Sequence, residues 1–293
     1  MSIFQATPDI AKSREQHREL YRMQGRYLRH IGLLAAAILG YYVWFFFTFG
    51  IDSGQILSGM VQLGRYFLRM FVWHDFVNWP FAYYFSQIAI TLAIVFAGTL
   101  TATVLALLLS FFAARNIMQG PVARIVALLV RRLFDLLRGV DMAIWGLIFV
   151  RAVGLGPLAG VLAIVMQDTG LLGRLYAEGH EAVERSPSRG LTAVGAAGIQ
   201  KHRFGIFTQS FPAFLSLSLY QIESNTRSAA VLGFVGAGGV GLVYAENMRL
   251  WNWDVVMFIT LILVCVVIAM DAISAWLRRR YITGKPVPLY SPQ

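Results

Sequence analysis

The glycine-rich stretch GFVGAGGVG, residues 233–241, carries the first pattern that could do chemistry. It contains the spacing Gly-x-Gly-x-x-Gly, which in dinucleotide-binding domains lets the backbone approach a pyrophosphate. That use requires a strand before the glycines, a helix after them and an acidic residue about 20 positions later. Here the glycines end a long apolar segment and precede the polar, aromatic segment LVYAENMRLWNWD. The context therefore argues against a nucleotide site.

Two other interpretations of these glycines remain open. Small residues let helix backbones approach closely, which would give the segment a packing role. Alternatively, a non-helical segment at membrane depth is tolerated where it lines a cavity, and in a transporter such a segment would form a gate. The glycines assigned to this gate are Gly236, Gly238, Gly239 and Gly241.

A second motif, His180-Glu181-x-x-Glu184, resembles the zinc-binding helix of metalloproteases. The second ligand position holds Glu184 in place of histidine, and no nearby cluster of cysteine and histidine supplies a third ligand. No serine–histidine–aspartate pattern or catalytic pair of carboxylates is recognisable. We therefore expect no metal, no cofactor and no enzymatic activity in this chain.

Charged residues inside apolar segments are the third candidate. Ser216, Tyr220, Glu223 and Arg227 follow one another at spacings of four, three and four, so they share one helical face. At about 1.5 Å per residue from Pro212, Glu223 lies ~16 Å and Arg227 ~22 Å along the helix. Charges at that depth must face a partner or water. An ion pair with only a packing role and a place on a substrate pathway are both open.

The apolar segment over 128–151 also contains charged residues, Asp135, Arg138 and Asp141, which are spaced three positions apart. Asn225 lies near the same stripe as Glu223 and could donate to an oxyanion or satisfy backbone carbonyls. A polar seam at the centre of a helix bundle is the shared consequence. The predicted substrate pathway comprises Tyr220, Glu223, Asn225, Arg227, Asp135, Arg138 and Asp141.

The composition indicates an integral membrane protein. Of the 293 residues, 57% are hydrophobic and 14% are charged, and the mean hydropathy is +0.62. The net charge of +10 comes from short basic blocks between long apolar stretches, which is a topology signal and not a nucleic-acid surface. The single cysteine, Cys265, excludes an internal disulfide.

Apolar runs of lipid-crossing length predict an all-α protein with six transmembrane helices. The predicted spans are 31–49, 86–112, 128–151, 157–175, 213–235 and 254–277. They form a single transmembrane domain over 31–282, preceded by a cytoplasmic amphipathic segment over 1–30 and followed by a short tail over 283–293. The distribution of arginine and lysine places both termini in the cytoplasm.

Residues 56–73 are also apolar, but two arginines lie at their centre. Each would cost about 2.5–3.5 kcal/mol in the middle of a membrane span. We therefore expect Ile56–Trp73 to be an external helix at the membrane interface, with Arg65 and Arg69 in water.

The long loop over 177–211 also calls for a function, because loops of this length inside compact domains are usually structured. Leu191, Val194 and Ile199 form the apolar face of a short helix interrupted by glycines. Such a helix suits a groove on a partner protein, and the alternative is a helix lying on the lipid surface.

Three sequence motifs resemble those of one family. The segments ESNTRSAAVLGFVGAGGVG and AVGLGPLAGVLA and the GA-containing loop are similar to the permease subunits of phosphonate-type ABC importers, over roughly residues 86 to 282. The resemblance implies the type I importer fold (MetI-like) in the bacterial inner membrane. The implied partners are a second permease chain in a homodimer, two cytoplasmic ATPases that hydrolyse ATP, a periplasmic or lipid-anchored solute-binding protein, and membrane lipid.

The resemblance also implies that the 177–211 loop couples the permease to its ATPase. In that comparison Gly195 matches the loop glycine and Pro212 the proline that enters the next span. The sequence departs from the family at Arg189, where an acidic residue is common, at Thr208 and at Asp141. The predicted coupling residues are Glu181, Ala182, Leu191, Ala193, Gly195, Ala196 and Gly198.

The function predicted from these observations is ATP-driven import of a phosphonate, phosphite or hypophosphite by alternating access. Arg227 would supply a weak positive field for the anion, and Glu223 would hold Arg227 in place. The alternative is an ion-coupled secondary transporter that uses intramembrane carboxylates as proton sites.

Overall fold

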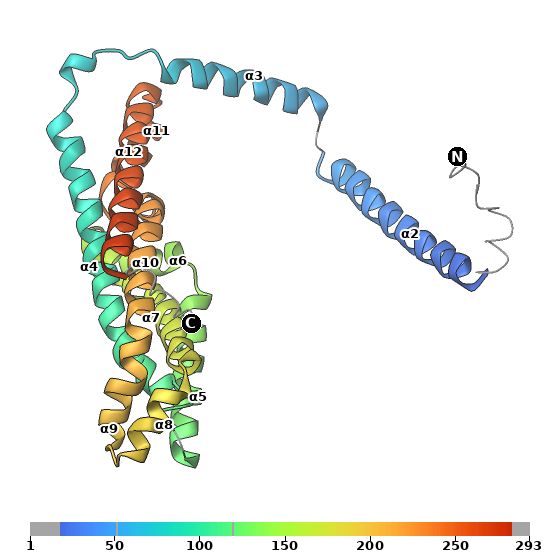
Figure 1. Ribbon diagram of the computed structural model, residues 1–293. Coiled ribbons are helices and arrows are strands. Elements are labelled where there is room, and N and C mark those ends of the chain that lie inside the picture. Colours follow the sequence, from blue (N-terminus) through green and yellow to red (C-terminus); the bar gives the residue numbers. More distant parts are fainter. Residues whose placement is uncertain (1–17, 51, 119, 283–293) are drawn as a thin grey trace, which may run out of the picture. The chain divides into compact units, whose positions relative to one another are not determined.

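The computed structural model describes residues 18–50, 52–118 and 120–282 (Figure 1). Within these ranges the regular secondary structure is entirely helical, which confirms the predicted all-α class. The chain divides into two units, Met1–Phe67 and Leu68–Gln293, which are described separately. The first 17 residues of the predicted amphipathic segment, and the tail over 283–293, lie outside the described residues.

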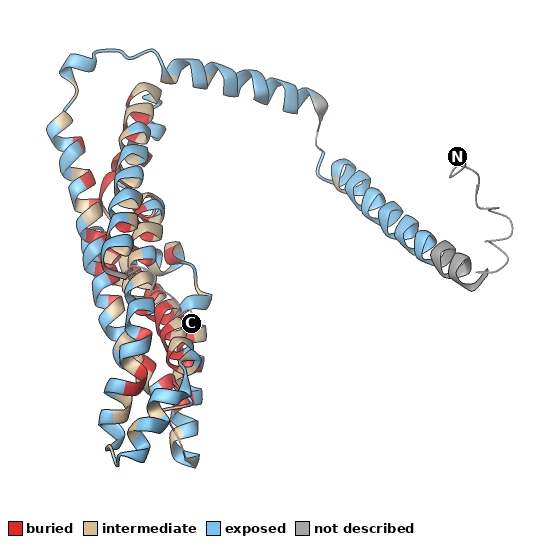
Figure 2. Ribbon diagram, viewed as in Figure 1, coloured by how far each residue is buried: buried red, intermediate tan, exposed pale blue. Residues whose placement is uncertain are grey.

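The first unit consists mainly of one long apolar helix, α2 (Arg18–Thr48). Its segment Tyr27–Thr48 is long and apolar enough to cross a membrane and contains most of the span predicted over 31–49. Figure 2 shows α2 as exposed along its described side chains, apart from Phe45, which is of intermediate exposure. An apolar helix with no packed face is suited to lipid contact.

The helix α3 (Ser53–Met70) covers most of the segment predicted to lie at the membrane interface. The boundary between the two units falls within it, after Phe67. Arg65 and Arg69 are both exposed.

The second unit is a bundle of long helices joined by short ones. Its helices are η1 (Phe76–Asn78), α4 (Phe81–Ala113), α5 (Pro121–Gly139), α6 (Met142–Val153), α7 (Pro157–Ala182), α8 (Arg185–Ala193), α9 (Gly198–Gln200), η2 (Lys201–Phe207), α10 (Thr208–Phe234), α11 (Val240–Arg249), α12 (Trp253–Leu277) and η3 (Arg278–Ile282). The helices α4, α7 and α10 pack against one another, and α10 also packs against α12. Figure 2 shows buried residues concentrated where these helices meet.

Small residues bring α4 and α7 close together. A methyl group added at Gly98 of α4 would lie 2.8 Å from the side chain of Ile164 on α7. Ala102 and Ala163 are fully buried. Glycine and alanine at such positions let two helix backbones approach, and dispersion contacts then hold them together in an apolar environment.

Small residues also let α5 pack closely on α7. A methyl group added at Gly170 of α7 would lie 2.7 Å from the backbone nitrogen of Arg138. The ring of Phe134, which is fully buried, lies over Gly173 one turn further along. The glycines of α7 therefore fix how closely α5 can approach.

The apolar stretch predicted as one span over 128–151 falls in two helices. α5 ends at Gly139, and α6 begins at Met142. The Asp141 carboxylate accepts a hydrogen bond from the Ala143 N–H at 2.9 Å and so caps the start of α6. An aspartate at this position satisfies a helix-start donor, which favours a new helix there.

Four helices of the described residues are long and apolar enough to cross a membrane: Tyr27–Thr48, Phe81–Ala113, Pro157–Ala182 and Trp253–Arg280. The helix α6 is apolar but has only 12 residues. The segment predicted to span over 213–235 lies in α10. This helix is long enough to cross a membrane, but it is too polar to count among these four helices.

Candidate functional site

A buried network of polar side chains joins α4, α7 and α10. Asp168 of α7 accepts hydrogen bonds from the side-chain amides of Gln221, at 2.8 Å, and Asn225, at 2.5 Å. Asn225 also donates to the hydroxyl of Thr99 on α4, at 2.8 Å. Asp168 and Thr99 have no exposed surface, and Asn225 is 1% exposed. Each buried acceptor thus has a donor, which is what makes a carboxylate tolerable inside a bundle.

Of this network, Asn225 alone is among the site residues predicted from the sequence. The structure places its side chain toward the core of the bundle, on a different face of α10 from Arg227, which is 48% exposed. The signals for the other members were weak. Asp168 is a lone carboxylate in an apolar segment, and Gln221 precedes Asn225 by one helical turn.

Glu223 is the centre of a second cluster. One carboxylate oxygen of Glu223 lies 2.7 Å from Nη2 of Arg227, and the other lies 3.2 Å from Nη2 of Arg278 in η3. The structure therefore brings the predicted Glu223–Arg227 pair together with a second arginine that the sequence analysis did not assign. The signal for Arg278 was the basic block over 278–280.

The Glu223 carboxylate is more sheltered than its partners. Its side chain is 13% exposed, against 33% for Arg278 and 48% for Arg227. Tyr220, one turn away, is also exposed. This face of α10 thus presents a net positive cluster whose guanidinium groups are reachable and whose carboxylate is held between them.

The predicted charges of the earlier segment separate into two places. Asp135 and Arg138 of α5 form an ion pair at 2.9 Å, and Arg174 of α7 comes within 4.0 Å of Asp135. Asp141 instead caps α6. Asp135 and Arg138 therefore belong to an interhelical ion cluster, and Asp141 has a local backbone role.

The predicted gate glycines form the turn between α10 and α11. Gly236, Gly238 and Gly239 have positive φ values of 92°, 80° and 73°, which favour glycine. The Gly156 N–H donates to the carbonyl of Gly236 at 3.2 Å, so this turn contacts the start of α7. Gly241, in α11, lies against the backbone of α10. A dinucleotide-binding loop would follow a strand, whereas this turn follows α10.

The turn is also tied to α4. The Val240 N–H, at the start of α11, donates to the hydroxyl of Thr91 at 2.8 Å, and both residues are buried. The hydroxyl of Thr91 in turn donates to the carbonyl of Gln87 at 2.9 Å. Thr91 therefore satisfies a backbone donor at the start of α11 that has no acceptor within its own helix.

The predicted coupling loop is a helix, a turn and a second short helix (Figure 1). Leu191 and Ala193 lie in α8, and Gly195 forms the turn with φ of 78°. The Ala196 N–H closes this turn by donating to the carbonyl of Leu191 at 3.0 Å. Gly198 begins α9. These residues thus form one compact projection at the end of the bundle.

The apolar face predicted for this loop divides in two. Val194 is 79% exposed and Ile199 is 83% exposed, whereas Leu191 is partly buried near Gly205. Two large aliphatic side chains at the tip of a projection leave apolar surface available to a partner.

Glu181 and Ala182, also predicted for coupling, lie at the end of α7. Glu181 forms an ion pair with Arg131 of α5 and accepts a hydrogen bond from the Arg115 N–H at 2.6 Å. Glu181 therefore links three parts of the bundle end beneath the loop. Among the described residues, no group of three or more His, Cys, Asp or Glu side chains could hold a metal ion.

Comparison with protein families gives one match that covers more than half of the chain. The family described as the binding-protein-dependent transport system inner membrane component matches residues 106–283.

Curated relatives agree with this match. The chain is 38% identical over 191 residues to the phosphite transport system permease protein PtxC of Stutzerimonas stutzeri, covering 65% of this chain and 68% of that protein. It is 33% identical over 198 residues to the phosphate-import permease protein PhnE of Mycolicibacterium smegmatis, covering 68% of this chain and 37% of that protein.

Solved structures show the same fold. The inward-facing MetNI methionine ABC transporter matches 68% of this chain and 97% of its own chain, with a TM-score of 0.60 and 17% sequence identity. An amino acid ABC transporter matches 71% of this chain and 100% of its own chain, with a TM-score of 0.53 and 15% identity.

Proposed function

The chain belongs to the family of inner membrane components of binding-protein-dependent transport systems, and from this premise we propose that it forms the membrane pathway for a phosphorus oxyanion. It is a permease of the ABC importer type. The proposed substrate class is a phosphonate, phosphite or hypophosphite. The names of relatives at 38% and 34% identity, both phosphite transport permeases, support this class.

The observation that carries the proposal is the cluster of Glu223, Arg227 and Arg278. Two guanidinium groups share one carboxylate, so the cluster keeps a net positive charge. Arg227 is also reachable from outside the bundle. Guanidinium groups suit tetrahedral oxyanions because their N–H groups match pairs of oxygens. One net charge attracts an anion without binding it tightly, which suits a site that must release its substrate.

The exposed face of α10 supports a two-chain pathway. Tyr220, Arg227, Val231 and Phe234 are exposed at spacings of seven, four and three, so they form one stripe along this helix. A second copy of the chain would cover the apolar part of the stripe and place two Arg227 side chains across a shared passage. Asp135 and Arg138 are proposed for the same passage, whereas Asp141 caps α6, and the Gly236–Gly241 turn is proposed as its gate.

The proposed driving force comes from separate ATPase subunits that dock on the α8 and α9 projection. Binding of ATP would move this projection and rock the helices, and hydrolysis would reset them. A solute-binding protein would deliver the anion on the opposite side. This arrangement places both termini and the projection in the cytoplasm, in keeping with the basic residues near them.

The test is uptake by proteoliposomes that contain the permease, its ATPase and its binding protein. Labelled phosphite, methylphosphonate and hypophosphite should enter only with ATP, and sulfate should serve as the tetrahedral anion without phosphorus. Uptake of sulfate in preference to all three would contradict the substrate class. Uptake driven by a proton gradient without the ATPase would contradict the ABC mechanism and favour an ion-coupled transporter.

A further inference from the structure

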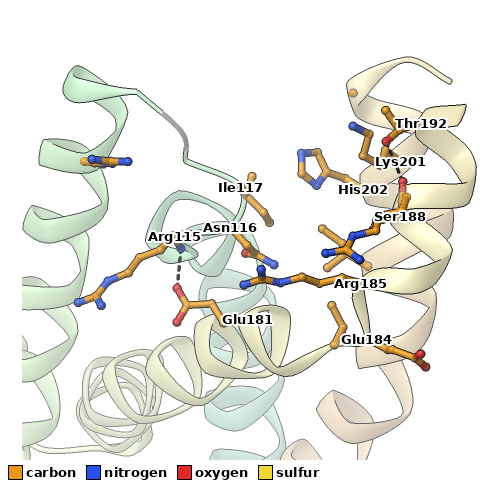
Figure 3. Close-up of a pocket in the computed structure, with 15 residues that line it drawn as sticks. Arg115, Asn116, Ile117, Glu181, Glu184, Arg185, Ser188, Thr192, Lys201 and His202 are labelled. Carbon is orange, nitrogen blue, oxygen red and sulfur yellow. Dashed lines mark hydrogen bonds between the residues drawn. The ribbon is translucent and has the colours of Figure 1, made fainter. Parts of the chain in front are cut away.

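A cavity of about 870 Å³ lies between the ends of α4, α5 and α7 and the segment from α8 to η2. Figure 3 shows Arg115, Asn116 and Glu181 on one side of it, with Arg185 and Lys201 on the side of the projection. A water molecule takes about 30 Å³ in the liquid. The cavity therefore has room for a hydrated polyatomic ion.

The lining of this cavity is strongly basic. Five of its side chains are cationic and two are carboxylates: Arg115, Arg124, Arg185, Arg189 and Lys201, against Glu181 and Glu184. Glu181 is already paired with Arg131, which lies outside the lining. Within the described part of the chain, none of the five cationic side chains forms an ion pair with a carboxylate. The cavity thus concentrates positive charge that no carboxylate of the described residues neutralises in an ion pair.

A histidine lies among these basic side chains. His202 lines the cavity, and its Nδ1 atom is buried without a hydrogen-bond partner in the described residues. Burial, and then the nearby Lys201, lower the pKa of the His202 imidazole, so the ring is neutral near pH 7. A neutral ring leaves the positive charge of the lining unchanged.

We propose that this cavity binds a phosphate-bearing anion, either inorganic phosphate or the phosphate of an anionic lipid headgroup. Arginine forks and lysine ammonium groups are the side chains that recognise phosphate. The bound anion lies between the bundle side of the cavity and Arg185 and Lys201 on the projection side. It therefore holds the α8 projection against the end of the bundle. The cavity binds this anion whichever solute the chain transports.

The first arm of the test uses the full-length chain in nanodiscs of neutral phosphatidylcholine. Inorganic phosphate is titrated in, with sodium chloride at matched ionic strength as the reference, and binding is followed by the thermal midpoint of unfolding. Phosphate should raise the midpoint saturably. In the double variant Arg185→Gln, Lys201→Gln the half-saturating concentration should rise by about tenfold or more, the equivalent of one lost charge-assisted contact.

The control is Arg203→Gln, which removes the same charge from the same segment. Arg203 is exposed and does not line the cavity. This variant should bind phosphate as the parent does. An equal loss in Arg203→Gln, or an equal effect of chloride, would show that only diffuse screening acts and would overturn the proposal.

The second arm distinguishes the source of the phosphate. Nanodiscs that contain phosphatidic acid are compared with neutral ones in the absence of inorganic phosphate. A higher midpoint in the parent and in Arg203→Gln, but not in the double variant, assigns the cavity to a lipid headgroup. A response to inorganic phosphate alone assigns it to the free ion. No response to either, in a chain that folds normally, overturns the proposal.

Discussion

Gln221 of α10 donates a hydrogen bond to Asp168 of α7 over 2.8 Å, although the two residues lie 53 positions apart in the chain. Asp168 is fully buried and also accepts from Asn225. One carboxylate thus fixes how α7 and α10 sit against each other, because its two oxygens satisfy two amide groups. A membrane interior offers those amides little else to bind.

Replacing Asp168 should therefore destabilise the bundle. Asp168→Ala leaves the amides of Gln221 and Asn225 without their shared acceptor, at about 1–3 kcal/mol for each unsatisfied group. Asp168→Asn keeps one acceptor oxygen and should lose less. Thermal unfolding of the purified chain measures both. Glu178→Ala is the control because Glu178 is half exposed and pairs with Arg174 of its own helix. Equal midpoints for Asp168→Ala and Glu178→Ala would contradict the role of the network.

A methyl group at Gly170 should separate α5 from α7. The added carbon of Gly170→Ala would lie 2.7 Å from the backbone nitrogen of Arg138, which cannot move without its helix. We expect a loss of about 1–3 kcal/mol, typical of overpacking. Gly190→Ala in α8 meets nothing within 4 Å. It should be neutral or stabilise by about 0.5–1 kcal/mol. A matching loss in both variants would rule out the packing explanation.

Features that depend on residue spacing within a single helix could be predicted from the sequence. Apolar runs gave the helices, and the spacing of four residues gave the Glu223–Arg227 pair, which the structure brings to 2.7 Å. The spacing of residues within one helix does not predict which residues of another helix they contact. Arg278, which lies 55 positions from Glu223, and Asp168 join their clusters only because particular helices pack together. Periodicity within a helix carries no information about such a partner.

The break between α5 and α6 was missed for a different reason. Asp141 is a favourable N-cap residue, so a signal was present in the sequence. The residues on both sides of Asp141 are largely apolar, so the end of α5 and the whole of α6 together form one apolar run of lipid-crossing length. Such a run predicts a single span. The backbone direction changes at such a cap, and this change repositions Asp141 away from Asp135 and Arg138.

Thr91→Val should loosen the glycine turn. Valine has nearly the shape of threonine but cannot accept from the buried Val240 N–H, which Thr91 now does at 2.8 Å. Leaving that donor unsatisfied should cost about 1–3 kcal/mol. Hydrogen exchange at Val240, measured by mass spectrometry, should become faster. Thr101→Val, on the same helix, is the control, because the Thr101 hydroxyl is exposed and donates to the carbonyl of Ala97 on its own helix. If exchange at Val240 is unchanged in Thr91→Val, Thr91 does not hold the turn.

Arg227→Ala should lower uptake of the phosphorus oxyanion by about tenfold or more, the equivalent of one charge-assisted contact. Assembly with the ATPase should be unaffected, because Arg227 is half exposed and lies on α10, far along the chain from α8. ATP-driven uptake in proteoliposomes gives the measurement, and co-purification of the ATPase reports assembly. Arg249→Ala, which removes an exposed arginine from the last turn of α11, should transport normally. Normal uptake by Arg227→Ala would remove this residue from the pathway.

Gly195→Val should uncouple the ATPase from transport. Gly195 is exposed, has φ of 78° and meets nothing within 4 Å, so the change acts through the backbone alone. A left-handed conformation costs an ordinary residue about 1–2 kcal/mol, and valine should relieve this by reshaping the turn between α8 and α9. Asparagine tolerates positive φ, so Gly195→Asn should keep most activity. ATP hydrolysis stimulated by the loaded binding protein distinguishes the two variants. Full stimulation in Gly195→Val would show that this turn does not transmit the movement of the ATPase.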